Sequence, residues 1–297
     1  MKKIMVEKYK ERSIEVTSRI GCRNMCKYCP QEKIIREYTK RTSEYLMSFM
    51  TFKKCLKKVP KNVRIDFSGM AEPWLGNECT RMLLYAYKSG HRKIAVFTTG
   101  IGMTLDDVEK IKHIPFEVFC VHVVDCENNT KIIINRNYIN LIKKINISNI
   151  KNLEYMTMGR PHPEMKKLLG EKIISKEMVS RGGNLKNFNE INRVGKIICS
   201  FPQWPERNVL LPNGDVVLCC MDYGMEYVLG NLIDINYEDL FKGHVYNDIV
   251  KKIKNEKFGD VICRHCEMAV SDNRLSLNEV IIKYLVGFKN AIFSKKN

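Results

Sequence analysis

A repeated alternation of strand-like and helix-like segments most limits how this 297-residue chain can fold. Six β-rich runs lie between residues 13 and 180, and helix-like patterns separate most of them. The expected strands are 13–20, 63–69, 93–99, 116–125, 153–159 and 173–180, and the expected helices lie near 44–58, 77–89, 104–112 and 136–145. Only a stub of helix is expected before the sixth strand, in PHPEMKKLLG.

This alternation predicts an α/β fold with a parallel sheet and right-handed crossovers. Six repeats are too few for a complete eight-stranded barrel, so we expect a partial (β/α)6 barrel. A doubly wound sheet is the alternative, because counting repeats does not fix the curvature of a sheet. Thr104 and Asp107 are placed as a capping pair for the third expected helix.

The alternation of strand-like and helix-like segments ends after residues 181–184, RGGN. The segment VLLPNGDVVLC predicts a β-hairpin that turns at PNGD, because Asn-Gly accepts the positive φ of a tight turn. A helical stretch near 237–254 and a CRHC segment at 263–266 follow. We therefore place a boundary near residue 187. Residues 1–187 form the barrel, and residues 188–297 form a small α+β extension.

Charge and apolar patterning indicate a cytoplasmic protein. No stretch approaches 18 uncharged apolar residues, and the N-terminus MKKIMVEKYKER is charged throughout, so neither a transmembrane span nor a signal peptide is expected. The net charge of +17 is spread over many short lysine runs, which is typical of a solvated surface. Phosphate-bearing substrates, anionic lipid and specific nucleic-acid binding are the alternatives.

Twelve cysteines without a secretory signal indicate metal or redox chemistry rather than disulfides. Cys22, Cys26 and Cys29 directly follow the first expected strand. Three thiolates on a four-iron cluster leave one iron open to a substrate or cofactor. Zinc is the alternative, but it normally needs a fourth ligand, and the nearest histidine in sequence is His91.

The motif CRNMCKYC has the form C-x3-C-x-aromatic-C and resembles the cluster motif of the radical S-adenosylmethionine (SAM) enzymes. The resemblance implies a partial (β/α)6 barrel and a [4Fe–4S] cluster held by these three cysteines. It also implies SAM chelated by the open iron, cleavage to a 5′-deoxyadenosyl radical, and an external one-electron reductant such as flavodoxin or ferredoxin. Tyr28, the aromatic residue of the motif, is an expected cofactor contact.

SGMAEP at 68–73 resembles the Gly-Gly-Glu-Pro segment of the same family, but it departs from that pattern at Met70 and Ala71. The resemblance implies that Gly69 leaves the backbone open to SAM and that Glu72 accepts hydrogen bonds from its ammonium group. Taken alone, the segment reads as an ordinary turn at a strand end. The TTG segment at 98–100 places Thr99 at another strand end that faces the cofactor.

A second cysteine set can supply four ligands: Cys199, Cys219 or Cys220, Cys263 and Cys266. Structural zinc competes on the residues alone. After such a barrel, however, the segment resembles the SPASM and twitch extensions and is most similar to the shortened form of a radical aminocyclitol dehydrogenase. This implies one auxiliary [4Fe–4S] cluster. Cys219 fits the Gly-x4-Cys spacing from Gly214 better than Cys220 does.

The resemblance predicts hydrogen abstraction from a small molecule or glycan, namely a sugar, aminocyclitol or polyol, followed by oxidation or epimerisation. Oxidation needs a base, for which Arg181 is the first candidate and Arg160 the second; either arginine can instead orient the substrate oxygen or form a surface ion pair. Epimerisation needs a thiol, for which Cys120 and Cys126 are candidates unless they are simply small buried residues. His122 shares the sheet face of Cys120.

Two other functions compete with this prediction. A peptide-modifying maturase commonly carries an N-terminal leader-binding domain, and only about twenty residues precede Cys22 here. A zinc-stabilised RNA-binding protein is the distant alternative. The tail at 275–297 opens with a capping box, Ser276 to Glu279, and predicts a basic amphipathic helix. This helix packs under the barrel or makes a peripheral membrane contact.

Overall fold

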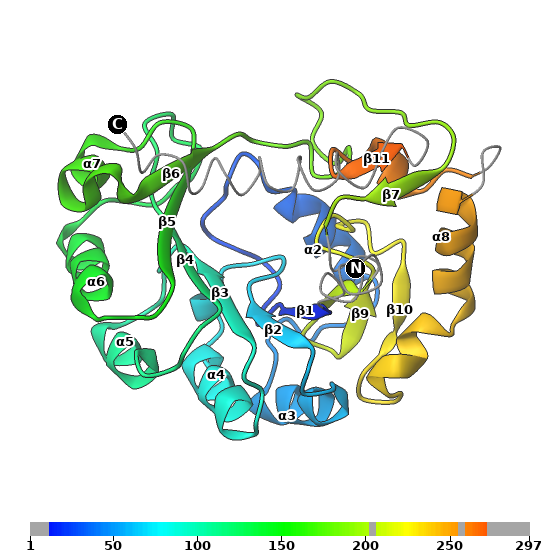
Figure 1. Cartoon of the computed structure of the whole chain (residues 1–297), viewed down its shortest axis with the longest axis horizontal. Coiled ribbons are helices and arrows are strands. Elements are labelled where there is room, and N and C mark those ends of the chain that lie inside the picture. Colours follow the sequence, from blue (N-terminus) through cyan, green and yellow to red (C-terminus); the bar gives the residue numbers. More distant parts are fainter. Residues whose placement is uncertain (1–11, 202–205, 255–258, 272–297) are drawn as a thin grey trace, which may run out of the picture.

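The computed structural model describes residues 12–201, 206–254 and 259–271. Its main element is a curved nine-stranded sheet with helices along its outer side (Figure 1). The strands of this sheet are β1 Ser13–Val16, β2 Arg64–Phe67, β3 Ile94–Thr98, β4 Val118–His122, β5 Leu153–Met158, β6 Ile173–Lys176, β8 Arg207–Leu210, β9 Asp215–Val217 and β10 Val228–Asn231. Their order is β10-β9-β8-β1-β2-β3-β4-β5-β6.

All six expected barrel strands are present, and neighbouring strands from β1 to β6 pair in parallel. The helices are α2 Gln31–Thr39, α3 Phe49–Lys58, α4 Cys79–Lys88, α5 Leu105–Ile111, α6 Arg136–Ile147, α7 Pro163–Leu169 and α8 His244–Lys254. Helices α3 to α7 lie along one side of β1 to β6 (Figure 1), whereas a doubly wound sheet would carry crossover helices on both sides.

The two faces of the barrel strands differ in polarity, because successive side chains point to opposite faces. Ile14 and Val16 of β1 belong to the main hydrophobic core, together with Ile65 and Phe67 of β2. The alternate residues Ser13 and Glu15 of β1 and Asp66 of β2 are buried and polar. On these two strands, the face opposite the apolar core is therefore polar.

Two local predictions are confirmed. Thr104 and Asp107 form a reciprocal capping box on α5. The hairpin is made by β8 and β9, with Gly214 at φ +90° in the turn. Strand β8 also pairs in parallel with β1, so the sheet runs unbroken from the barrel into the extension. The boundary near residue 187 stays a prediction.

Helix α2 was not expected. It follows the first cysteine motif directly and buries Ile34 and Tyr38 in a second apolar cluster, which includes Val209 and Val217. The tail at 275–297 lies outside the described residues. No helix among the described residues is long and apolar enough to cross a membrane.

Candidate active site

The carboxyl ends of parallel strands meet at one edge of a sheet, and this edge carries the first cysteine motif. The motif loop leaves β1 and is fixed to loops that follow other strands. Asn24 donates from Nδ2 to Thr99 Oγ1 at 2.9 Å, beyond the end of β3. The backbone N–H of Lys27 donates to the carbonyl of Asn129 at 2.8 Å. The loop is thereby held over the open end of the barrel.

Gln31, the first residue of α2, fixes two of the three motif cysteines. Its Oε1 accepts from the backbone N–H of Cys22 at 3.0 Å, and its Nε2 lies 3.1 Å from the sulfur of Cys29. The same Nε2 donates to the carbonyl of Met70 at 2.5 Å, which ties the motif to the SGMAEP turn. The sequence analysis missed this residue, and its position two residues after Cys29 was the available signal.

Burial governs the protonation of the first cysteine set. It raises the pKa of Cys22, while the backbone N–H groups of Asn24 and Glu72 act to lower it. Burial also raises the pKa of Cys26 to about 12, with smaller contributions from Cys29 and Cys22. The three thiols therefore lie within electrostatic reach of one another, and those of Cys22 and Cys26 stay protonated until a cation binds them.

Glu72 and Thr99, both expected beside the cofactor, contact each other. One carboxylate oxygen of Glu72 accepts from the backbone N–H and the hydroxyl of Thr99, each at 2.7 Å. The other oxygen accepts from the Thr98 hydroxyl. Burial raises the pKa of Glu72, and these donors oppose the shift. Three of the roughly four acceptor positions of the carboxylate are used within the chain.

Gly69, the other predicted contact of this segment, has φ +82°. A Cβ added there would stand 2.2 Å from Thr17 Oγ1, and that hydroxyl accepts from the backbone N–H of Met70 at 3.1 Å. Gly69 therefore allows close packing of the β1 and β2 ends.

Tyr28 links the motif to the far wall of the barrel. Its ring stacks on His122, with centroids 5.5 Å apart, and its hydroxyl lies 3.3 Å from each ring nitrogen. Its carbonyl accepts from Arg181 Nε at 3.1 Å. Burial, and then the nearby Arg181, lower the pKa of His122 to about 4, so this imidazole is neutral at pH 7.

Arg181 is an internal cation. Burial acts to lower its pKa, but the neighbouring Tyr223, Cys220 and Cys29 outweigh burial and raise it. The guanidinium therefore keeps its proton, which favours the orienting role over that of a base. Arg160, the second candidate, is instead exposed and pairs with Glu127 at 2.7 Å.

The two candidate thiols differ in position. Cys120 is 4% exposed and lies on the inner face of β4, where Glu154 and Lys176 influence its pKa, which burial raises to about 12. Cys126 is exposed, with its sulfur 3.2 Å from the carbonyl of Pro161. Cys120 is therefore the thiol that faces the barrel interior.

The second cysteine set lines one largely apolar pocket. A small antiparallel pair, β7 Ile197–Cys199 and β11 Ala269–Ser271, sets Cys199 opposite Ala269. A 3-10 turn, η4 Ile262–His265, carries Cys263. The pocket is lined by Cys199, Phe201, Arg207, Cys219, Cys220, Met221, Ile262, Cys263, Cys266, Met268 and Ala269.

The neighbouring residues Cys219 and Cys220 have different surroundings. Burial raises the pKa of Cys219, and Cys263 adds to that shift. Burial and the Glu15 carboxylate raise the pKa of Cys220 to about 12, while Arg207 and Arg181 act to lower it. Cys219 thus lies with the pocket cysteines, whereas Cys220 also reaches the charged barrel interior. This difference supports the choice of Cys219 as the fourth ligand.

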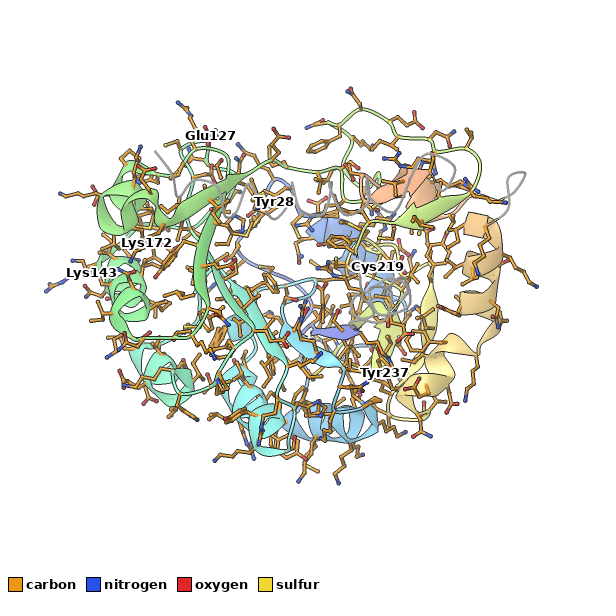
Figure 2. All side chains as sticks on the ribbon, in the orientation of Figure 1. Tyr28, Glu127, Lys143, Lys172, Cys219 and Tyr237 are labelled. Carbon is orange, nitrogen blue, oxygen red and sulfur yellow. The ribbon has the colours of Figure 1, made fainter. Side chains whose placement is uncertain are left out.

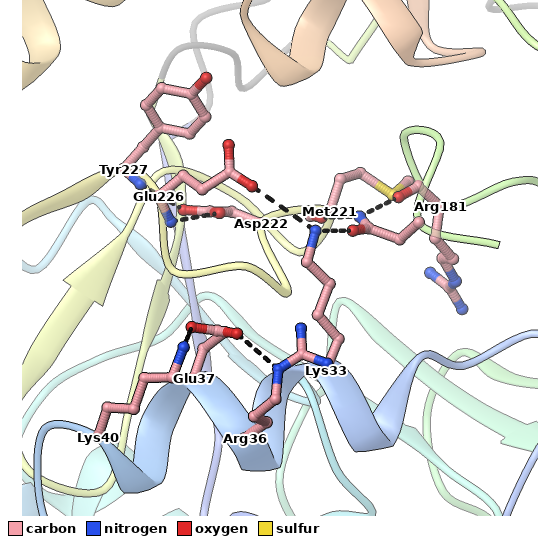
Figure 3. Close-up of polar contacts among 10 residues, drawn as sticks. Lys33, Arg36, Glu37, Lys40, Arg181, Met221, Asp222, Glu226 and Tyr227 are labelled. Atoms are coloured by element: carbon pink, nitrogen blue, oxygen red, sulfur yellow. Dashed lines mark hydrogen bonds and ion pairs between the residues drawn. The ribbon is translucent and has the colours of Figure 1, made fainter.

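The loop after Cys219 joins the second set to the first. The hydroxyl of Tyr223 lies 3.4 Å from the sulfur of Cys29. Asp222 fixes this loop by accepting from the backbone N–H groups of Glu226 and Tyr227 at 3.0 and 2.9 Å (Figure 3). The loop that follows Cys219 therefore contacts the first cysteine set.

Contacts between α2, the 181–184 segment and the loop that follows Cys219 hold the two cysteine sets in place. Asn184 accepts from Lys33 Nζ at 2.7 Å and donates to the carbonyls of Arg181 and Met221. Tyr28 and Cys219 lie toward the middle of the molecule, while Lys143 and Lys172 lie at its periphery (Figure 2). Lys143 and Lys172 are thus part of a solvated surface, as expected for the excess positive charge.

Both cysteine sets fit iron–sulfur ligation by their chemistry. Within the described residues, no three His, Cys, Asp or Glu side chains converge on the position of a single metal ion. A four-iron cluster instead takes one thiolate on each ligated iron, so its ligands surround it. The iron of such a cluster gives each bound thiolate a cationic partner. Buried thiols in a pocket with apolar walls therefore suit a four-iron cluster.

A curved parallel sheet, with a three-cysteine loop after its first strand and a cysteine-lined extension, is the arrangement expected of the radical SAM fold. Residues 199–267 match the SPASM family, an iron–sulfur cluster-binding domain. No curated protein sequence matches the chain.

Solved structures with the same fold match most of the chain. BtrN in complex with AdoMet and 2-DOIA is 16% identical, with a TM-score of 0.60 over 88% of this chain and 94% of that one. The anSMEcpe structure with bound AdoMet is 13% identical, with a TM-score of 0.57 over 95% and 93%. Streptococcus suis SuiB bound to precursor peptide SuiA is 12% identical, with a TM-score of 0.59 over 89% and 72%. The predicted partial barrel and SPASM-like extension are confirmed.

Proposed function

We propose that this chain is a radical SAM oxidoreductase that uses two [4Fe–4S] clusters to oxidise a carbohydrate-like alcohol. The contact between Tyr223 and Cys29 carries this proposal, because it joins the auxiliary-cysteine loop to the SAM-site cysteines. The similarity to structures solved with AdoMet supports the cofactor. When bound, the first cluster supplies the electron that cleaves SAM, and the second accepts an electron from the substrate.

The interior side chains determine what the substrate meets. Loss of a hydrogen atom from the carbon of an alcohol leaves a radical, which becomes a carbonyl when one proton and one electron depart. Arg181, held by the carbonyl of Tyr28, presents a fixed cation that orients the hydroxyl oxygen. Neutral His122 beside Tyr28 can take the proton, directly or through a water molecule.

A polar substrate suits this interior better than an apolar side chain does. Arg181 lies within electrostatic reach of His122 and of Glu15, and Glu15 pairs with Arg207 at 3.1 Å. The structural relatives include one solved with 2-DOIA and one bound to a precursor peptide, so peptide modification is the second candidate. These charged and polar groups favour a sugar, aminocyclitol or polyol.

The test is anaerobic reconstitution followed by a substrate screen. We expect about eight irons per chain, divided between a three-cysteine and a four-cysteine site. We also expect 5′-deoxyadenosine formation that rises with aminocyclitols or sugars and not with peptides. Tightly bound zinc at the second set would contradict the two-cluster proposal, and turnover stimulated only by peptides would support the maturase instead.

Cys120 separates oxidation from epimerisation. If the reaction is an oxidation, Cys120→Ala changes turnover only modestly, because no thiol hydrogen is needed. We expect this result, with Cys126→Ala as the matched control. An inverted product that gains one solvent deuterium in the wild type, and is lost in Cys120→Ala, would show that the enzyme is an epimerase.

A further inference from the structure

The pocket lined by the second cysteine set has an uneven distribution of charge. Among the described residues that line it, Arg207 is the one with a formal charge, and its neighbours there are cysteines and apolar side chains. Arg207 is the first residue of β8, the strand that joins the extension to the barrel sheet. Its position therefore depends on the parallel pairing of β8 with β1.

The guanidinium of Arg207 is fixed from two directions. Its Nε lies 3.1 Å from Glu15 Oε1, and its carbon Cζ lies 3.9 Å from the centroid of the Phe201 ring. The Arg207 side chain is 19% exposed and that of Glu15 is 6% exposed. Glu15 also accepts from Ser68 Oγ at 3.1 Å. This buried pair is ordered by short contacts to Ser68, directly after β2, and to Phe201.

The pair is oriented with respect to the pocket. Arg207 lines the pocket, whereas Glu15 lies on the barrel side of it, between Arg207 and Ser68. Of the pair, Arg207 lines the pocket, while the Glu15 carboxylate also lies beside Cys220. Arg207 lines the same pocket as Cys199 and Cys220.

A fixed cation at the edge of a cluster changes its reduction potential. A [4Fe–4S] cluster with four thiolate ligands is anionic, and its reduction adds a further negative charge. A positive charge beside it stabilises the reduced form more than the oxidised form, and it does so more strongly in a buried site than in water. Arginine suits this role, because it keeps its charge at all working pH values.

We propose that Arg207, held in place by Glu15, raises the reduction potential of the auxiliary cluster and so makes it a better acceptor for the substrate electron. The inference rests on the proposed function, which supplies the cluster. The step it serves is one-electron oxidation of the substrate radical. The C–OH carbon becomes C=O, a proton leaves the oxygen, and the cluster is reduced by one electron.

The test is an EPR-monitored redox titration of the 297-residue chain with Cys22→Ala, Cys26→Ala and Cys29→Ala, so that the auxiliary cluster alone is observed. Arg207→Gln is expected to raise the ratio of oxidised to reduced cluster at least tenfold at a fixed potential, which is a downward shift of about 59 mV for a one-electron couple. Glu15→Gln is expected to shift the potential in the opposite direction. Arg207→Lys, which keeps the charge, should stay close to the parent.

Two further variants keep the test decisive. Arg207→Gln leaves Glu15 buried without its partner, which can impair folding. The double variant Arg207→Gln/Glu15→Gln removes that problem and should have a lower potential than Glu15→Gln alone. Arg160→Gln is the matched control, because it removes an arginine from an exposed ion pair.

The outcomes distinguish this inference from the proposed function. A cluster that is present in full amount, with the same potential in all variants, overturns the role of Arg207 and leaves the proposed function standing. Potentials that move in one direction for both Arg207→Gln and Glu15→Gln also overturn it, since that pattern reflects altered packing. A second pocket without iron overturns the proposed function, and this inference with it.

Discussion

Glu72 offers the sharpest test of how the SAM site is built. Its buried carboxylate accepts three hydrogen bonds from Thr98 and Thr99, which are 3% and 7% exposed. Glu72→Ala leaves the backbone N–H of Thr99 without an acceptor, at a cost of about 1–3 kcal/mol, and the two hydroxyls lose acceptors as well. Removal of the desolvated carboxylate offsets part of this loss, so we expect a destabilisation of about 3 kcal/mol.

The assay compares thermal unfolding of the cluster-loaded protein under anaerobic conditions. At about 2 °C per kcal/mol for a long chain, Glu72→Ala should lower Tm by about 6 °C. Glu72→Gln should lower it by less, because the amide keeps an acceptor for Thr99 and can donate to Thr98. Glu78→Gln, which removes a carboxylate from a surface pair with Arg81, is the control and should change Tm little.

SAM affinity measured on the same variants reveals whether Glu72 also binds the cofactor. Because three of its acceptor positions are already used, we expect Glu72→Gln to weaken SAM binding less than tenfold. An unchanged Tm with a hundredfold loss of SAM affinity would refute the reasoning. That loss corresponds to about 2.7 kcal/mol, the range of a direct bond to the ammonium group.

Three other predictions concern the cysteines, the auxiliary loop and the pH dependence of stability. The triple variant Cys22→Ala/Cys26→Ala/Cys29→Ala should keep about four irons and lose all SAM cleavage, and iron loss from both sites would contradict independent ligand sets. Tyr223→Phe should leave the iron content unchanged and alter the EPR spectrum of the SAM-site cluster, because its hydroxyl lies beside the Cys29 sulfur; an identical spectrum would count against this contact. Burial lowers the pKa of His91, which is fully buried, to about 4, below the pKa near 6.5 of a histidine in the unfolded chain. The stability that neutral His91 contributes is therefore lost as the pH falls from about 6.5 toward 4. Between pH 7.5 and 5 the wild type should lose about 2 kcal/mol that His91→Leu does not lose, as measured by denaturant unfolding at each pH.

The barrel was predictable because its signals are local. Each strand is a short β-rich run between helical patterns, and the Thr104 capping box and the PNGD turn lie within a few residues of sequence. Helix α2 was missed because it begins directly after the cysteine motif and shows only two buried positions, Ile34 and Tyr38, over nine residues. Such a segment carries too little apolar periodicity to predict a helix.

The candidate site was predictable only where its residues are adjacent in sequence. The spacing of the cysteines identified both sets, and the strand-end positions of Glu72 and Thr99 placed them at the same edge. Their mutual contact could not be predicted, since it spans 27 residues. The contacts of Tyr223 with Cys29 and of Arg207 with Glu15 span more than 190 residues, and no local pattern encodes them.

The parallel pairing of β8 with β1 accounts for most of what the sequence could not reveal. A hairpin between β8 and β9 alone would satisfy the pattern VLLPNGDVVLC, and the extension could then form a separate domain. Pairing with β1 instead sets Arg207 opposite Ser13 and beside Glu15. The strand that begins the barrel thus contacts both the first cysteine loop, which follows it, and the wall of the second cysteine pocket. A change in either site that displaces β1 must reach the other, so variants of Glu15 should affect both clusters more than variants of any outward-facing residue of the same strand.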